Sequence, residues 1–283
     1  MTDIPQEDLV PAEVSPGKSV DDRFGHKVVM TVPVRHNPKL RRLMDEVNGD
    51  DDLYGLWVAA NVNATERLGM TDHGPVHVKI VMNLAVRMLR LLVDAGVRPS
   101  VVADYEMEPE DAEIVVALAA LLHDVGMSIH RADHEAFSLF VAQDKLRHLL
   151  PTLYDERRAT ILRAEILHAI ISHRSGGKPL TLEAGVVRIA DALDMAKGRS
   201  RISFESGSLS IHSVSAAAIE GITLERGRDR AICVTVDMSN SAGLFQLDQL
   251  LREKLNGSGL EPHIQIRARL EEEEKRLLTD FTL

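Results

Sequence analysis

The longest apolar run of the chain, the nine residues Ile114–Leu122, is followed at once by two residues that are costly to bury, His123 and Asp124. The run is too short to span a bilayer. A helix that is apolar on every side must be enclosed by other helices, so the run predicts a central helix over 110–123. Its polar end needs a partner in the interior, and a metal ion suits a histidine beside a carboxylate.

Apolar stripes at helical spacing surround this segment in the sequence. A helix is predicted over 76–93, where His77 lies on the stripe that should face the core. Another is predicted over 163–173 and is ended by SGGKP. A further helix is predicted over 181–195, where Asp191 interrupts the apolar row. The low aromatic content of 4% and the many Ala, Leu and Val residues also favour helices.

After residue 201 the pattern changes to short alternating runs that are typical of half-buried strands. Strands are predicted over 222–227, 231–238 and 263–271, and a helix over 244–255. The expected fold class is therefore mainly α, a helical bundle, with a small C-terminal α+β domain of β-β-α-β order. The strand AICVTVDM is expected to leave an open edge that pairs with a second subunit, which favours a homodimer.

Three regions are expected along the chain: a flexible tail at 1–25, a helical domain at 26–205 and the small α+β domain at 206–283. The N-terminus lacks the apolar stretch of a signal peptide. The single cysteine, Cys233, excludes an internal disulfide and a Cys-rich zinc module. These features favour a cytoplasmic protein without membrane association. A net charge of −10 argues against stable non-specific binding to nucleic acid.

Ionisable residues recur on apolar helix faces and at helix ends, where a lone histidine is more often a satisfied core residue than a ligand. Here five separate segments each contribute such a residue, which core polarity rarely does by chance. The set is His77, His123, Asp124, His134, His168, His173 and Asp191. Imidazole and carboxylate ligands without thiolate favour Mn, Fe, Co, Mg or Zn in an open catalytic site. A closed structural zinc site would instead recruit cysteine.

The order His77, then His123-Asp124, then Asp191 within IADALDM resembles the signature of the HD superfamily of metal-dependent phosphohydrolases. The resemblance includes HVKIVMNLAVRML and the turn HRSGGKP, and it covers residues from about 70 to about 200. It implies an HD-domain helical bundle around a metal site. A first metal ion would be held by His77, His123, Asp124 and Asp191. A second would be held by His134 and His173, with Asp124 bridging the two ions.

The resemblance thus implies two divalent ions, Mn²⁺ or Fe before Co²⁺, Mg²⁺ or Zn²⁺, and it leaves His168 undecided as a ligand. The chain departs from the family at Met127, because many members have a lysine three residues after the His-Asp pair. His130 is a candidate to replace that lysine, unless the phosphate is held from elsewhere.

The remaining candidates are assigned to catalysis and to substrate contact. Asp124, His130 and Lys178 are expected to take part in catalysis. The cations expected to bind the substrate are Arg174, Lys178, Lys197, Arg199 and Arg201. The run 197–201 fits a basic helix end favoured by the helix dipole as well as a phosphate clamp. Asp194 is expected to orient a ligand or to cap a salt bridge rather than to bind metal.

The resemblance implies a metal-dependent phosphohydrolase, a phosphatase or phosphodiesterase that uses a metal-activated water. Its substrate would be a phosphate mono- or diester of a nucleotide or related small molecule. Two other classes stay open. The HD fold also supports di-iron oxygenases with similar ligands, and a non-catalytic module could bind a nucleotide as a sensor. The complete ligand set argues against the sensor, because a degenerate site would be free to lose ligands.

Overall fold

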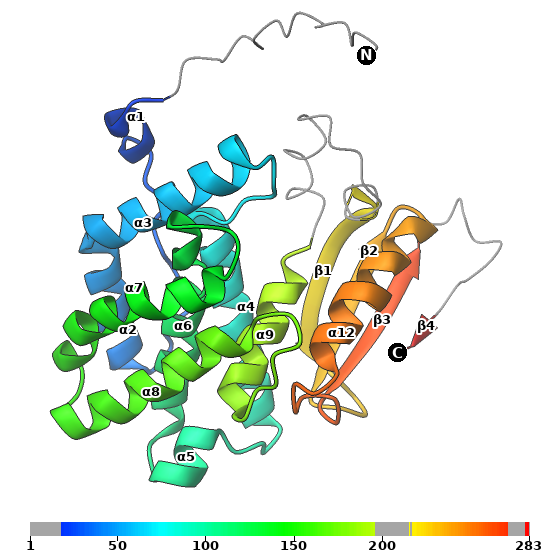
Figure 1. Ribbon diagram of the computed structural model, residues 1–283. Coiled ribbons are helices and arrows are strands. Elements are labelled where there is room, and N and C mark those ends of the chain that lie inside the picture. The colour runs from blue at the N-terminus through cyan, green and yellow to red at the C-terminus, as the bar shows by residue number, and fades with distance from the viewer. Residues whose placement is uncertain (1–17, 196–214, 216, 271–280, 283) are drawn as a thin grey trace, which may run out of the picture.

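The computed structural model describes residues 18–195, 215, 217–270 and 281–282 of the chain. Figure 1 shows a helical bundle with a small sheet beside it, so the predicted fold class is confirmed. The helices of the bundle are α1 Val20–Phe24, α2 Pro38–Gly49, α3 Asp51–Asn61, α4 Pro75–Asp94, α5 Ser100–Tyr105, α6 Pro109–Leu122, α7 His134–Leu149, α8 Glu156–Ser172 and α9 Leu182–Leu193. A π-helix, Val62–Arg67, extends α3, and short 3-10 turns lie at Val125–Ser128 and Leu150–Thr152.

Helix α6 is the centre of the bundle. Each residue of its apolar run, 114–122, is 0% exposed, and α2, α4, α8 and α9 pack against it. Its last turn is tied to α3, because the Trp57 indole donates to the carbonyl of Leu121 at 2.8 Å. The predicted central helix is therefore confirmed, and the core surrounds the segment that carries His123.

Local signals set where the neighbouring helices begin. Helix α4 begins after Gly74, and the Asp72 side chain accepts from the backbone N–H of Gly74 at 2.9 Å. The helix predicted over 163–173 begins earlier, at the first residue of α8, because Asp155 caps it by accepting from two backbone N–H groups of the first turn. Helix α9 begins after the Thr181 cap, close to the predicted start.

The C-terminal sheet has the strand order β1-β2-β3-β4, with β1 Ile219–Arg226, β2 Ile232–Met238, β3 Ile264–Leu270 and β4 Phe281–Thr282. Strand β2 is antiparallel to β1 and parallel to β3. The parallel pair requires a crossover, and helical residues 244–255 supply it. They include the π-helix Gln246–Leu251 and α12 Arg252–Leu255. The order β-β-α-β agrees with the prediction.

The prediction of an open edge at 231–238 is wrong. Strand β2 is paired on both sides along its whole length, so its hydrogen-bonding groups are used within the sheet. The sheet buries β2 because the crossover helix returns the chain to its other side. The homodimer stays a prediction that no longer has this support.

The bundle and the sheet are in contact. Helix α4 packs against β1 and β2, and α9 packs against α12 and the π-helix before it. At Gly185 of α9, an added Cβ atom would lie 2.4 Å from the carbonyl oxygen of Ser258. The backbone of the segment between α12 and β3 therefore approaches α9 as closely as a glycine permits.

Of the three expected regions, residues 1–17 and the boundary near 205 lie outside the described residues. Within the expected tail, α1 forms and Arg23 pairs with Glu66 of the bundle at 2.8 Å. Among the described residues, no helix is both long enough and apolar enough to cross a membrane.

Candidate metal site

Six candidate ligands from five segments meet at one end of the bundle. Each lies near a helix end: His77 in the first turn of α4, His123 and Asp124 just after α6, His134 at the start of α7, His173 just after α8 and Asp191 in the last turn of α9. All are buried except Asp191, whose side chain is 19% exposed. The cluster therefore opens to solvent on the side of Asp191.

The turn after the His-Asp pair brings α7 to the cluster. Ser138 of α7 donates to the carbonyl of His123 at 2.6 Å and accepts from the N–H of Gly126 at 2.8 Å. A Cβ atom at Gly126 would lie only 2.1 Å from the carbonyl oxygen of His134. Glycine at this position thus lets the start of α7 pack directly against the turn.

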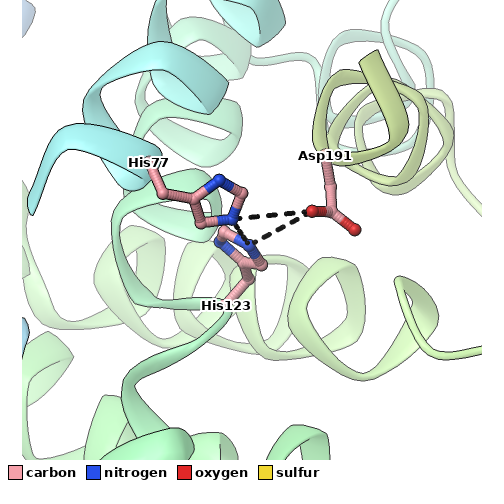
Figure 2. Close-up of side chains that lie close together, drawn as sticks. All are labelled: His77, His123 and Asp191. Atoms are coloured by element: carbon pink, nitrogen blue, oxygen red, sulfur yellow. Dashed lines mark hydrogen bonds and ion pairs between the residues drawn. The ribbon is translucent and has the colours of Figure 1, made fainter. Parts of the chain in front are cut away.

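One half of the cluster consists of His77, His123 and Asp191, which Figure 2 shows pointing toward one another. The Nε2 atoms of the two histidines are 3.1 Å apart. Oδ1 of Asp191 lies 3.6 Å from Nε2 of His77 and 3.7 Å from Nε2 of His123. Oδ2 of Asp124 lies 3.3 Å from each of these two nitrogen atoms.

The other half is built on the second oxygen of Asp124. Its Oδ1 lies 3.2 Å from Nε2 of His134 and 3.7 Å from Nε2 of His173. His134 and His173 also form a group with Glu135 in which ligand atoms are close enough to share an ion. The carboxylate of Asp124 therefore has one oxygen in each half. A third ligand group, His123, Asp124 and His173, joins the two halves.

The orientation of each imidazole is set through its Nδ1 atom. This nitrogen lies 2.7 Å from the carbonyl oxygen of Ala120 in His123 and 2.5 Å from that of Ile170 in His173. In His77 it lies 2.6 Å from Oδ2 of Asp194. A carbonyl oxygen only accepts, so Nδ1 carries the proton in His123 and His173, and the Asp194 carboxylate favours the same tautomer in His77. Nε2 then directs its lone pair into the cluster.

His134 has a more crowded Nδ1 atom. It lies 3.1 Å from the carbonyl oxygen of Arg131 and 3.1 Å from Oε2 of Glu135. The Arg131 guanidinium, a donor, is also 2.9 Å away. Two acceptors against one donor favour a protonated Nδ1 and an inward lone pair at Nε2, as in the other three histidines.

The donor set fits a cation. With Nδ1 protonated in His77 and His123, two nitrogen lone pairs face each other at 3.1 Å, which is unfavourable unless a positive charge lies beside them. Nitrogen and carboxylate oxygen donors in a buried group are the ligand types of open Mn, Fe, Co, Mg or Zn sites. The cluster therefore has the composition and the orientation of a divalent metal site.

The electrostatics of the cluster agree with this. Burial alone would raise the pKa of Asp124, but His123 and the other imidazoles hold it well below its ordinary value. The pKa of Asp191 is lowered in the same way, with Lys254 contributing. Burial would lower the pKa of His123, but Asp124 and Asp191 outweigh it and raise this pKa to about 10, so that without a metal ion a proton on Nε2 of His123 supplies the positive charge between the two rings. The two carboxylates thus stay charged and attract positive charge to their centre.

Two predicted histidines, His168 and His130, are not among these six ligands. His168 accepts the backbone N–H of Leu180 at 3.0 Å and belongs to none of the three ligand groups found among the described residues. His130 is exposed and accepts the backbone N–H of Ala132 at 3.0 Å. Both therefore stabilise loops in this structure. At Met127, where a lysine was expected from the resemblance, the side chain is fully buried in a small core cluster with Ala60 and Ala64.

The predicted substrate cations are only partly described. Arg174 and Lys178 are exposed on the turn that follows His173, beside the cluster in sequence. Lys197, Arg199 and Arg201 lie outside the described residues.

Sequence reasoning missed two neighbours of the cluster, Glu135 and Lys254. Glu135 had a signal, since it is an acidic residue next to the candidate ligand His134. Lys254 had none, because it comes from the C-terminal domain and only the folded chain brings its Nζ atom to 3.6 Å from Oδ2 of Asp191.

Comparisons with known proteins identify the same part of the chain. A family model described as "HD domain" matches residues 76–196, which contain all six candidate ligands. Among curated proteins, the chain is 43% identical over 224 residues to the uncharacterized protein MJ1020 of Methanocaldococcus jannaschii. That match covers 79% of this chain and 86% of the relative. No solved structure matches the chain.

Proposed function

Since the chain belongs to the HD-domain family, we propose that it is a phosphohydrolase that uses two divalent metal ions to cleave a phosphate mono- or diester of a nucleotide-like small molecule. The family suggests metal-dependent hydrolase activity, and the described His and Asp groups could bind a metal ion. The observation that carries the proposal is that the two carboxylate oxygens of Asp124 face different sets of imidazole nitrogens.

The proposed ligands divide accordingly. His77, His123 and Asp191 would hold one ion, His134 and His173 the other, and Asp124 would contact both. Bound divalent ions supply an activated water nucleophile and offset charge on the phosphoryl oxygens. Neutral imidazoles suit this chemistry, because they leave most of the charge of the ions available to the substrate.

The other residues of the chain would bind and orient. The Nδ1 contacts hold the rings in place before substrate arrives, so little reorganisation is needed. Asp191 is the partly exposed ligand, and a substrate would approach from its side. Arg174 and Lys178 are the described members of the proposed substrate cations, and Asp124, His130 and Lys178 are proposed to take part in catalysis. Lys197, Arg199 and Arg201 remain proposed phosphate contacts.

The test is a metal analysis of the purified protein followed by a screen of phosphate mono- and diesters, nucleotides included, with added Mn²⁺. We expect one to two ions per chain and Mn²⁺-dependent release of phosphate or a monoester. The variant Asp124→Asn keeps the shape of the side chain but removes its charge, and it should lower turnover more than about 100-fold.

Asp133→Asn is the matched control, since Asp133 is exposed and has a positive φ that asparagine tolerates. Absence of bound metal together with no activation by Mn²⁺, Co²⁺ or Fe²⁺ would exclude the proposal. Oxygen consumption by the iron-loaded protein without ester cleavage would replace it with an oxygenase.

A further inference from the structure

Lys254 of α12 extends from the C-terminal domain to the metal site. Its ammonium group lies 3.6 Å from Oδ2 of Asp191 and donates to the carbonyl of His173. Both partners belong to candidate ligands, one on each side of the cluster. The side chain is 21% exposed, close to the 19% of Asp191. Lys254 therefore lies at the rim where the cluster meets solvent.

The two oxygens of Asp191 have different neighbours. Oδ1 faces the Nε2 atoms of His77 and His123, and Oδ2 faces Lys254. A carboxylate that rotates about its last bond can exchange its two oxygens or present both. A cation fixed on the Oδ2 side opposes that rotation and keeps a single oxygen directed into the cluster.

The position of Lys254 is itself well determined. Arg188 of α9, which is 1% exposed, donates from Nε to the carbonyl of Lys254 at 2.9 Å. Its Nη1 donates to the carbonyls of Ser172 and Arg174 at 3.1 and 2.5 Å. Three successive carbonyls at the end of α8, those of residues 172–174, thus accept from Arg188 or Lys254. One buried guanidinium connects α9, the end of α8 and the backbone of α12.

A second contact joins the same elements. Ser175, on the turn after His173, donates to Glu253 at 2.9 Å. The adjacent residues Glu253 and Lys254 therefore both contact the segment at the end of α8. This is a specific docking of α12, and a lysine with only a solvated surface role would not require it.

We propose that Lys254 is a positioning residue of the metal site, supplied by the C-terminal domain, which holds the outer oxygen of Asp191 so that the inner oxygen stays directed at the ion shared with His77 and His123. The proposal rests on the proposed metal-dependent function. It gives the C-terminal domain a direct part in the site. The competing explanation is a cation that only stabilises the C-terminal end of α8 through the helix dipole, and this explanation predicts no effect on metal affinity.

The test compares Lys254→Met with Lys254→Arg in the full chain. Methionine keeps the apolar stem and removes the charge, whereas arginine keeps the charge. We expect Lys254→Met to weaken Mn²⁺ binding, measured by calorimetric titration of the metal-free protein, by about 10-fold or more. Turnover should fall with it while KM for the ester changes less than about twofold. Lys254→Arg should recover part of both losses.

Arg252→Met is the matched control, because Arg252 is a cation on the same helix whose side chain is 57% exposed and pairs only with Asp248 among the contacts described. It should bind Mn²⁺ like the wild type. If Lys254→Met does not fold, as judged by circular dichroism, Lys254→Gln replaces it, since glutamine still donates to the His173 carbonyl without a charge.

The outcomes are distinct. Unchanged Mn²⁺ affinity in the uncharged variant overturns the proposal, even if its stability falls. A raised KM with unchanged Mn²⁺ affinity also overturns it, in favour of direct substrate contact. A wild-type protein that binds no divalent ion refutes the proposed function itself, and the role of Lys254 with it.

Discussion

The ring of His77 lies between two carboxylates with different tasks. Asp124 faces its Nε2 atom inside the cluster, and Asp194 accepts from its Nδ1 atom at 2.6 Å on the other side. Asp194 is not in any of the described ligand groups. Its contact orients the ring and raises the basicity of Nε2, as partners of metal-bound histidines generally do.

Replacement of Asp194 should therefore act through His77. We expect Asp194→Ala to weaken Mn²⁺ affinity about 10- to 100-fold. Asp194→Asn should cost less, because its carbonyl oxygen still accepts from Nδ1. Titration of the metal-free protein measures both variants. Equal affinities in the wild type and Asp194→Ala would show that the contact with His77 has no effect on the site.

Most of the candidate ligands could be predicted from the sequence for a physical reason. A histidine or aspartate on an apolar stripe, such as His77 or Asp191, is conspicuous because burial without a partner is costly. Lys254 was not predictable in this way, because a lysine on a short exposed helix looks like any solvated cation. Its role depends on the docking of α12 against α9, and no pattern within either helix reports that contact.

Helix α9 is the element on which the site and the C-terminal domain meet. It carries Asp191 and Arg188 toward α12, and at Gly185 it meets the carbonyl of Ser258. The absence of a side chain at Gly185 is thus a condition for this packing.

Gly185→Ala should separate the two surfaces. The added methyl group would overlap the Ser258 carbonyl at 2.4 Å, so we expect a loss of about 1–3 kcal/mol in the free energy of unfolding. Gly49→Ala is the control, because Gly49 is also a helical residue, the last of α2, and an added Cβ atom there meets nothing within 4 Å. That change should be neutral or stabilise by less than about 1 kcal/mol. Urea denaturation compares the two variants, and equal stabilities would contradict the close packing at Gly185.

Glu183 links the start of α9 to the start of α5 and should make the stability depend on pH. It is 1% exposed and accepts the backbone N–H groups of Ser100 and Val101 at 3.2 and 3.1 Å. Burial raises the pKa of Glu183 above its ordinary value of 4.5, although these hydrogen bonds oppose the shift. The folded state then favours the protonated form, so the contribution of Glu183 is fully present below pH 4.5 and is lost as the pH rises through the folded-state pKa.

Glu183→Gln cannot ionise and should not show this loss. The free energy of unfolding of the wild type minus that of the variant should therefore decrease as the pH rises from 4.5 toward 8. Urea titrations at several pH values measure the difference, in which the contributions of other groups cancel. A difference that increases with pH would mean that the hydrogen bonds outweigh burial.

Some helices and strands could be predicted from the sequence better than others. The central helix followed from its continuous apolar run, and the three longer strands followed from their short alternating runs. The edge status of β2 did not follow, since it depends on where the chain returns after the crossover. The early start of α8 was missed, although Asp155 caps it and Ala159 and Leu162 continue the buried face of the helix.

For the whole molecule, folding should not depend on the metal ion. The core around α6 is fully buried and consists of apolar side chains that need no ion, unlike a zinc finger, which unfolds without metal. Removal of metal with EDTA should leave the far-ultraviolet circular dichroism unchanged. Addition of free Mn²⁺ at about 100 times its Kd should raise the free energy of unfolding by about 2.7 kcal/mol. Collapse of the helical signal in EDTA would mean that the ion is structural.

The contacts at Nδ1 also decide how the site responds to genetic change. For His123 and His173 the acceptor is a backbone carbonyl, of Ala120 and Ile170. Every amino acid carries that carbonyl, so no substitution of Ala120 or Ile170 can remove it without moving the helix end. For His77 the acceptor is a side chain, and one nucleotide substitution in the Asp194 codon removes it. The orientation of His123 and His173 thus depends on the fold alone, whereas that of His77 depends on the identity of a single residue.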